Sequence, residues 1–345
     1  MSEPFLVITP DAQYPDDGEV ERPVMGSGAR LEIYRERDLH RLPAGRVAQA
    51  DAFLVWHEVA FDRASIAALP RCRVIVRAGV GFDHIDLAAA GEAGIPVCNT
   101  PDYGTSEVAD HAIALMLTLA RGIATYHDAL RADPVGSFVP ALAPGVTRIR
   151  GRRLGIVGLG RIGTATALRA KAFGLEVVAY DPYVSRGQEI AVGVGRVDTL
   201  AELLAGSDVV SLHAPLTEET RGMIDAAALA AMPRHAFLIN TARGAIVDHL
   251  ALLEALQSGG IAGAALDVLP QEPADPDHPL IKAYTAKPSP LAGRLVLTPH
   301  AAWFSPQSAR DARRLSTETL MAYLTRGDLR NCVNGSYLSQ LRKFD

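Results

Sequence analysis

The sequence predicts an α/β protein made of two doubly wound units, each with a parallel sheet. Three observations lead to this prediction. The chain has 345 residues, enough for two domains of about 150 residues. Short apolar runs alternate with helical patterns almost throughout, as they do when helices cover both faces of a parallel sheet. An irregular stretch then divides these runs into two series.

The first series of apolar runs predicts five strands of a small open sheet. Each run lies near a turn signal, and a sheet of this size makes a plausible domain of about 100 residues. The strands are expected at Phe5–Thr9, Leu31–Tyr34, Ala52–Trp56, Val74–Val76 and Ile95–Cys98.

A long helix is expected next, from Ser106 to Arg121. The prolines and glycines of residues 133–145 then indicate an irregular connection. No function is assigned to that connection.

The second series predicts six strands with crossover helices, which is a doubly wound domain. Two of the helices are expected at Ile162–Ala172 and Asp248–Ser258. The strands are expected at Arg153–Val157, Glu176–Tyr180, Val209–His213, Phe237–Asn240, Ala262–Asp267 and Leu295–Thr298.

The last strong helical pattern, Ser305–Arg326, follows the completed second sheet. We expect this helix to cross back to the first domain, because the first sheet has few helical patterns to cover it. The first domain is therefore expected at residues 1–104 and 301–345, with the second, residues 105–300, inserted into it.

Composition narrows the class of protein. The net charge of −5 gives no electrostatic footprint for nucleic acid. The three cysteines are far apart and show neither zinc spacing nor a disulfide framework. We therefore expect no metal and a reduced, cytoplasmic location. No signal peptide is recognised in residues 1–10. The most apolar run, residues 109–120, is too short for a bilayer and contains Asp110 and His111.

A glycine loop, Gly158-x-Gly160-x-x-Gly163, lies between an expected strand and an expected helix. The first glycine permits a tight turn, the second lets the backbone approach a pyrophosphate, and the third lets the helix pack closely on the strand. The helix N-terminus offers N–H groups and a positive dipole end to phosphates. The simpler alternative is a glycine-rich turn without a ligand.

Asp181 decides between these readings. It ends the next strand, 18 residues after Gly163, where an acidic side chain takes the ribose hydroxyls of a dinucleotide. The same charge repels a 2′-phosphate, so NAD is favoured over NADP. A Walker-type loop is excluded because no Gly-Lys-Ser/Thr follows. The second domain is therefore predicted to be a Rossmann domain that binds NAD.

Three side chains near strand ends suit hydride transfer at a hydroxyl-bearing carbon. Arg243 offers a planar cation for a carboxylate. His300, after Pro299, is the best acid–base candidate. Glu272 could hold its ring and stabilise the imidazolium. Taken singly, each has a plainer reading as a loop charge or a structural histidine.

Motifs around these residues resemble the D-isomer-specific 2-hydroxyacid dehydrogenase family, most clearly from Val74 to Asn334. The glycine loop is followed in order by Asn-Thr-Ala-Arg-Gly, by Ala-Leu-Asp-Val with Glu-Pro five residues after its Asp, and by Thr-Pro-His. Several stretches are similar to the C-terminal-binding-protein branch of that family. They include residues 81–86, 148–151, 168–174, 181–183, 300–303 and 331–334.

The resemblance implies a Rossmann NAD-binding domain inserted into a flavodoxin-like substrate domain. It implies that Arg243 binds the substrate carboxylate and carbonyl, and that His300 is the general acid in reduction and the base in oxidation. Glu272 would hydrogen-bond His300. The backbone amides of Ala78, Gly79 and Val80 would hold the carboxylate from the first domain, with added charge from Arg77. Trp303 would wall the substrate pocket, although simple packing is also possible.

The cofactor would contact the loop and several strand ends. Asp267 would lie by the nicotinamide, Thr105 near the cleft and residues 213–220 along the adenosine. The expected contacts are Thr105, Gly158, Leu159, Gly160, Arg161, Ile162, Gly163, Asp181, His213, Ala214, Pro215, Thr220, Thr241, Ala242, Asp267 and His300.

The function expected is NAD-dependent interconversion of a 2-oxo acid and a D-2-hydroxy acid, in a homodimer that forms through the NAD domain. The stereochemistry and the dimer come from the resemblance alone. One alternative is a binding protein in which NADH controls assembly; the intact Arg243, Glu272 and His300 set argues against it. Another is a phosphoglycerate or hydroxypyruvate/glyoxylate dehydrogenase, which predicts basic residues at the pocket or a small pocket, whereas Trp303 suggests an apolar substituent.

Overall fold

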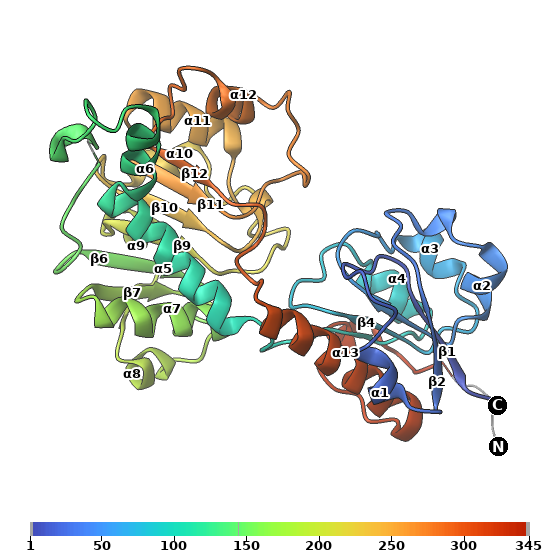
Figure 1. Cartoon of the computed structure of the whole chain (residues 1–345). Helices are drawn as coiled ribbons and strands as arrows, with labels where there is room; N and C mark the ends of the chain where they lie inside the picture. Colours follow the sequence, from blue (N-terminus) through green and yellow to red (C-terminus); the bar gives the residue numbers. More distant parts are fainter. Residues whose placement is uncertain (1–2, 144, 343–345) are drawn as a thin grey trace. The chain divides into compact units, whose positions relative to one another are not determined.

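The computed structural model describes residues 3–143 and 145–342. The chain divides into two compact units (Figure 1). Unit 1 contains the described residues up to Gly104 and those from Phe304 onward, and unit 2 runs from Thr105 to Trp303. The second boundary falls three residues after the expected residue 300. Residues 1, 2 and 343–345 of the expected substrate domain lie outside the described residues.

Unit 1 contains a five-stranded sheet in which every pairing is parallel. The strand order β2-β1-β3-β4-β5 is that of flavodoxin-like folds. The strands are β1 (Phe5–Thr9), β2 (Ala29–Ile33), β3 (Ala52–Val55), β4 (Val74–Arg77) and β5 (Val97–Cys98). β5 begins later than expected, after Pro96, which has no N–H to donate to a ladder.

Alternate residues of these strands enter two different cores. Leu6, Ile8 and Phe53 pack with the helices on one face, whereas Val7 and Leu54 belong to the core on the other face. The short helices of this part are α1 (Glu21–Met25), η1 (Leu39–Arg41), α2 (Ala44–Gln49), α3 (Arg63–Ala67) and α4 (Leu87–Glu92). Helices of five or six residues are too short to show a helical period, so the sequence analysis missed them.

α13 (Pro306–Arg326) packs on the sheet of unit 1, as expected for the last helix. Its residues Leu320, Met321 and Leu324 share a core with the strands. The helix begins at a capping box in which Ser305 and Ser308 bond to each other's backbone amides. η4 (Gly335–Tyr337) follows it.

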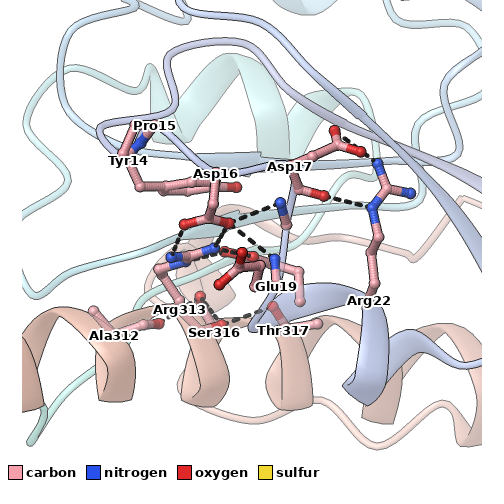
Figure 2. A network of polar contacts seen from close by, with 12 residues as sticks. Tyr14, Pro15, Asp16, Asp17, Glu19, Arg22, Ala312, Arg313, Ser316 and Thr317 are labelled. Carbon is pink, nitrogen blue, oxygen red and sulfur yellow. Dashed lines mark hydrogen bonds and ion pairs between the residues drawn. The ribbon is translucent and has the colours of Figure 1, made fainter.

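A buried ion-pair network joins α13 to the segment after β1 (Figure 2). The Arg313 guanidinium donates to Asp16 and to Glu21 at 2.7 Å each. The guanidinium carbon lies 3.6 Å from the centre of the Tyr14 ring. Moving α13 away from the segment of Tyr14–Glu21 would leave buried charges without partners, which is strongly unfavourable. The network therefore holds the helix against this segment.

Unit 2 contains a seven-stranded sheet, again with every pairing parallel. The order is β12-β11-β10-β9-β6-β7-β8, and it reverses at β6, as in Rossmann domains. The strands are β6 (Arg153–Val157), β7 (Glu176–Tyr180), β8 (Gly195–Arg196), β9 (Val209–Leu212), β10 (Phe237–Asn240), β11 (Gly263–Leu266) and β12 (Leu295–Leu297). Six of these strands were predicted from the sequence. β8 was not, because its two residues make no apolar run.

Helices cover both faces of this sheet. One core joins the strands to α5 (Thr105–Arg121) and α7 (Arg161–Ala172). The other joins them to α9 (Leu200–Ala205), α10 (Ala226–Ala231) and α11 (His249–Ser258). The remaining helices are α6 (Ile123–Ala132), η2 (Pro140–Leu142), α8 (Gln188–Val192), η3 (Gly244–Ile246) and α12 (Pro279–Thr285).

Among the described residues, no single helix has the length and apolar character needed to cross a membrane. α5 and α6 pass that test only when joined, with a bend of 61° between them. The apolar positions of α5 lie in the core of unit 2.

Candidate functional site

The glycine loop connects β6 to the N-terminus of α7. Gly158 has a φ of +92°, and a Cβ there would lie 2.9 Å from the Ala214 amide nitrogen. A Cβ at Gly163 would overlap the Gly158 carbonyl oxygen. A Cβ at Gly160 would meet nothing within 4 Å. The loop is therefore tightly packed at both ends and open in the middle, and α7 has no side-chain cap at its N-terminus. This geometry fits a pyrophosphate.

Asp181 lies beside this loop, directly after β7. Its Oδ2 accepts the Leu159 amide at 2.8 Å, and its Oδ1 accepts the amides of Tyr183 at 2.9 Å and Val184 at 3.1 Å. These bonds fix the carboxylate at the strand end. The sequence predicted its place, and the structure adds that Asp181 also holds the loop.

The segment that follows β10 carries Arg243. Asn240 clamps the turn, since its Oδ1 accepts the Ala242 amide at 3.0 Å and its Nδ2 donates to the Arg243 carbonyl at 2.8 Å. Arg243 is half-buried, and its Nη1 donates to the Ala242 carbonyl at 2.8 Å. The Thr241 hydroxyl is buried and has no partner among the described residues. A buried hydroxyl without a partner at a strand end fits a ligand that would satisfy it.

The segment after β9 forms a loop that is closed by its own hydrogen bonds. Thr220 Oγ1 donates to the Pro215 carbonyl at 2.6 Å and accepts the Thr217 amide at 2.8 Å. His213 precedes this loop, with its Nε2 2.9 Å from Ser211 Oγ. Desolvation lowers the pKa of the His213 ring to about 4. The ring is therefore neutral near pH 7 and adds no charge to this strand end.

His300 and Glu272 meet as the sequence analysis proposed. His300 Nδ1 lies 2.6 Å from Glu272 Oε2. The other carboxylate oxygen of Glu272 accepts the Leu269 amide at 2.9 Å. His300 itself has a φ of +52°, which only a small share of non-glycine residues adopt. Its amide donates to the Asp267 carbonyl at 2.7 Å, which holds this unusual backbone in place.

The buried carboxylate of Asp267 holds the turn around His300 from the other side. It accepts the amides of Ala301 and Ala302 at 2.9 Å each and the Thr298 hydroxyl at 2.6 Å. The resemblance placed Asp267 by the nicotinamide, which stays a prediction. What the structure shows is a positioning role for this side chain.

Two residues of this arrangement were not predicted. His111 Nε2 lies 3.0 Å from Thr298 Oγ1 and 3.6 Å from Asp267 Oδ1. The signal was a histidine within the most apolar run of the chain, which the sequence analysis used only against a membrane span. A polar ring on the core-facing side of a helix needs a polar partner, and Asp267 with Thr298 supplies it.

The loop Arg77–Gly81 of unit 1 follows β4. Arg77 folds beneath this loop, because its Nε donates to the Gly81 carbonyl at 2.9 Å and a Cβ at Gly79 would overlap its guanidinium. Arg77 therefore supports the loop. The Ala78 amide donates to the Val55 carbonyl at 2.7 Å, so it is engaged in the sheet. Of the three backbone amides that were expected to donate to the substrate carboxylate, those of Gly79 and Val80 remain candidates.

The other expected residues have the following places. Thr105 is the first residue of α5, and Trp303, which is partly buried, ends unit 2. Arg77, Ala78, Gly79 and Val80 belong to unit 1 and all other expected site residues to unit 2.

Comparison with known families decides what this arrangement belongs to. The sequence model of the D-isomer specific 2-hydroxyacid dehydrogenase NAD binding domain matches residues 113–302. The chain belongs to the D-isomer specific 2-hydroxyacid dehydrogenase family. The matched residues lie in unit 2, which is the NAD binding domain of that family.

Two curated relatives show the breadth of the family. The chain is 33% identical to C-terminal-binding protein 1 of Caenorhabditis elegans over 326 residues, which cover 92% of this chain and 44% of that protein. It is 38% identical to D-3-phosphoglycerate dehydrogenase of Archaeoglobus fulgidus over 288 residues, 84% of this chain and 52% of that protein. The chain thus spans about half the length of these curated relatives.

Solved structures match both units. An NADPH-dependent glyoxylate/hydroxypyruvate reductase from Sinorhizobium meliloti, in complex with NADP and malonate, has a TM-score of 0.84 at 28% identity, covering 100% of both chains. D-lactate dehydrogenase from Aquifex aeolicus, with NAD and lactic acid, has a TM-score of 0.80 at 31% identity, covering 96% of this chain and 99% of that chain. These structures confirm the predicted fold of two parallel-sheet α/β domains.

Proposed function

We propose that this chain is an NAD(H)-dependent D-2-hydroxyacid dehydrogenase, which also runs as a 2-oxoacid reductase. The observation that carries the proposal is the 2.6 Å contact between His300 and Glu272 in an NAD binding domain of this family. A binding protein without chemistry has no need of an acid–base side chain oriented by a carboxylate.

The dinucleotide would bind along the glycine loop. The open position at Gly160 would admit its pyrophosphate, Asp181 would take its ribose hydroxyls, and the Thr241 hydroxyl offers an unused polar group. When bound, the cofactor supplies the nicotinamide that gives or takes a hydride at the substrate carbon. The remaining chemistry belongs to the side chains.

Arg243 would bind the substrate carboxylate and polarise its carbonyl, since a planar guanidinium matches both oxygens of a carboxylate. The amides of Gly79 and Val80 would hold the carboxylate from unit 1. In reduction, His300 Nε2 would donate a proton to the carbonyl oxygen. In oxidation, the same atom would accept the hydroxyl proton. Glu272, on Nδ1, would keep the ring oriented and stabilise its charged form.

For the substrate we propose small 2-oxo and 2-hydroxy acids with an apolar substituent, because Trp303 follows His300 closely in the sequence. The named ligands of two similar structures, malonate and lactic acid, are small carboxylates. The phosphoglycerate alternative, favoured by the Archaeoglobus fulgidus relative, requires a cationic pocket for phosphate.

A steady-state assay on a panel of 2-oxo acids with NADH tests the proposal. We expect turnover on small 2-oxo acids with apolar substituents. Turnover should be lower on 2-oxo acids that carry a phosphate group. Tight NADH binding without turnover on any acid would instead support the NADH-sensing reading, which the relative named C-terminal-binding protein 1 favours. Activity confined to phosphorylated substrates would favour the phosphoglycerate reading.

We also propose a homodimer, formed by the segment that consists of α6 and the described residues 133–143 and 145–146. α6 buries none of its residues, and Val135 and Phe138 are 86% and 80% exposed. The other exposed apolar residues of this segment are Ile123, Leu130, Val139, Leu142 and Val146. Several exposed apolar side chains within one segment suit an interaction surface. A second copy is the occupant because most oligomers are symmetric dimers.

Sedimentation measures this association directly. The double variant Val135→Ser, Phe138→Ser should dissociate at concentrations where the wild-type chain sediments as a dimer. Ile190→Ser is the matched control, because this exposed apolar residue lies on α8, outside the segment. A wild-type chain that sediments as a monomer contradicts the proposal.

The cytoplasmic location expected from the cysteines stays a prediction.

A further inference from the structure

Cys98 and Cys332 lie far apart in the sequence but face each other in unit 1. Cys98 ends β5, and Cys332 belongs to the segment after α13. The two residues form an isolated antiparallel bridge. Its hydrogen bonds run from the Asn99 amide to the Asn331 carbonyl at 3.1 Å and from the Val333 amide to the Val97 carbonyl at 2.8 Å. The absence of a disulfide framework in the sequence reflects only the separation of the cysteines along the chain.

This hydrogen-bond pattern defines the geometry of the pair. The bonds are made by the residues on either side, so Cys98 and Cys332 occupy a non-hydrogen-bonded position of the antiparallel pair. In that position the Cα atoms are about 4.5 Å apart and the side chains are close. Disulfides bridge Cα atoms about 4.4–6.8 Å apart. The backbone therefore already meets the Cα-distance requirement for a bond between the two sulfurs.

The backbone of this pair is held by the side chain of Asn334, whose Oδ1 also accepts the Cys332 thiol at 3.4 Å. Asn334 is fully buried; its Oδ1 accepts the Val97 amide at 2.8 Å and its Nδ2 donates to the Ile95 carbonyl at 3.0 Å. The pair would thus stay in register whether or not the sulfurs are joined.

The two thiols differ in exposure and in acidity. Cys98 is buried in the core beneath α13, whereas Cys332 is partly exposed. The proximity of the two thiols lowers the pKa of Cys332 and raises that of Cys98. Because the thiolate is the nucleophile, Cys332 is the sulfur that an oxidant reaches and that reacts first. Cys72, the third cysteine, is buried in the core on the other face, and its thiol donates to the Val74 carbonyl at 3.4 Å.

The bridge continues directly into the loop Arg77–Gly81. Asn99, next to Cys98, donates from its Nδ2 to the Val80 carbonyl at 2.8 Å. The Thr100 amide donates to the Gly79 carbonyl at 2.9 Å, and the Thr100 hydroxyl donates to the Arg77 carbonyl at 2.7 Å. A restraint on Cys98 would thus reach the loop through Asn99 and Thr100.

We propose that Cys98 and Cys332 are a reversible oxidation site, closed to a disulfide by hydrogen peroxide or a similar peroxide, and that closure restrains the loop Arg77–Gly81. The Cys332 thiolate attacks one oxygen of hydrogen peroxide, which stays on the sulfur as the oxygen of a sulfenic acid. The O–O bond breaks, and the other oxygen leaves as hydroxide and is protonated to water. Cys98 then attacks the Cys332 sulfur, and the sulfenic oxygen departs as a second water. The two thiols lose two electrons and two protons, the peroxide is reduced to water, and a dithiol reverses the step.

Thiol counting and peptide mass analysis test the first part on the wild-type chain. After mild peroxide treatment we expect two of the three cysteine thiols to be lost, with the Cys98 and Cys332 peptides joined at a mass lower by two hydrogen atoms. Dithiothreitol should restore all of them. Cys72→Ser, the matched control, should form the same bond, and Cys332→Ser should not. Sulfinic acid at Cys332 beside a free Cys98, or bonds that join two chains, would overturn the proposal.

Amide hydrogen exchange tests the second part without an activity assay. We expect the amides of Gly79, Val80 and Thr100 to exchange more slowly in the oxidised chain than in the reduced chain. Equal exchange in both forms would overturn the restraint on the loop. The role of that loop in binding substrate rests on the proposed function, so a changed KM is the matching activity readout. A chain that forms the bond and slows exchange but turns over no 2-oxo acid would contradict the proposed function and leave the oxidation site intact.

Discussion

Glu272 contacts His300 Nδ1 at 2.6 Å with one carboxylate oxygen and the Leu269 amide at 2.9 Å with the other. The Leu269 amide therefore holds the Glu272 carboxylate in place, and this carboxylate in turn orients the His300 ring. His300 is held a second time through its own amide, which donates to the Asp267 carbonyl at 2.7 Å. Both the ring and the backbone of His300, the residue that we propose moves a proton, are therefore held by hydrogen bonds.

His300→Gln should lower turnover by about 10²–10⁴-fold, because the variant loses the acid–base group that contributes this much in enzymes of this kind. NADH binding, measured by fluorescence, should not change. The control is His40→Gln, an exposed residue of η1 in unit 1, which should change neither quantity. Unchanged turnover in His300→Gln would mean that another group moves the proton.

Asp181→Asn should lower the preference for NAD over NADP. The variant loses the negative charge that repels a 2′-phosphate, and it weakens the hydrogen bond to the Leu159 amide. Hydrogen bonds to charged groups contribute about 1.5–3 kcal/mol, which sets the expected loss of NAD affinity. Titration of both cofactors measures it. Asp198→Asn, at a carboxylate 71% exposed, is the control, and an unchanged NAD/NADP ratio would remove Asp181 from ribose binding.

Asp267→Asn should destabilise unit 2 by about 1–3 kcal/mol, because an amide group cannot accept all the donors that the carboxylate satisfies and leaves a buried N–H unpaired. Turnover should fall as well, since Ala301 and Ala302 adjoin His300. Urea unfolding and steady-state assays measure the two effects. The exposed Asp277→Asn should change neither. A stable Asp267→Asn variant with wild-type turnover would contradict the positioning role.

Acid should weaken the contact of α13 with the segment of Tyr14–Glu21. Hydrogen bonding to Arg313 lowers the pKa of Asp16 below its ordinary value of 3.8. A depressed carboxyl pKa stabilises the fold above that ordinary value, and the stabilisation is lost as the pH falls through the folded-state pKa. Between about pH 6 and about pH 3, the free energy of unfolding should fall more for the wild-type chain than for Asp16→Asn. Asp17→Asn, whose side chain is 89% exposed, should behave like the wild type; an equal fall in all three chains would contradict the linkage.

The sequence predicted the strands well where burial on both faces makes a continuous apolar run. β1, β6, β7 and β10 have the expected bounds. β8 and the short helices of unit 1 were missed because elements of so few residues are too short to show a periodic apolar pattern. The glycine loop and Asp181 follow from short motifs that can be recognised locally. The pairing of His300 with Glu272 was implied by the resemblance to the family.

Contacts between residues that lie far apart in the sequence could not be predicted from local motifs. His111 and Thr298 are 187 positions apart, and only the fold brings the helix α5 beside the turn after β12. The bridge of Cys98 and Cys332 is of the same kind. The amide of Ala78 was misjudged for a related reason, because the sequence does not show that β4 extends its pairing to Val55.

The sheet of unit 1 takes one of its two cores from opposite ends of the chain. Leu320, Met321 and Leu324 cover Val7, Leu54 and Val76. During synthesis, the strands of residues 5–98 therefore leave the ribosome with one apolar face covered only in part, by Met25 of α1, and that face stays incomplete until α13 has been made. Unit 2 is encoded in a single uninterrupted stretch and can complete its sheet first. Newly made chains should consequently depend most on chaperones during the interval between the first sheet and the last helix.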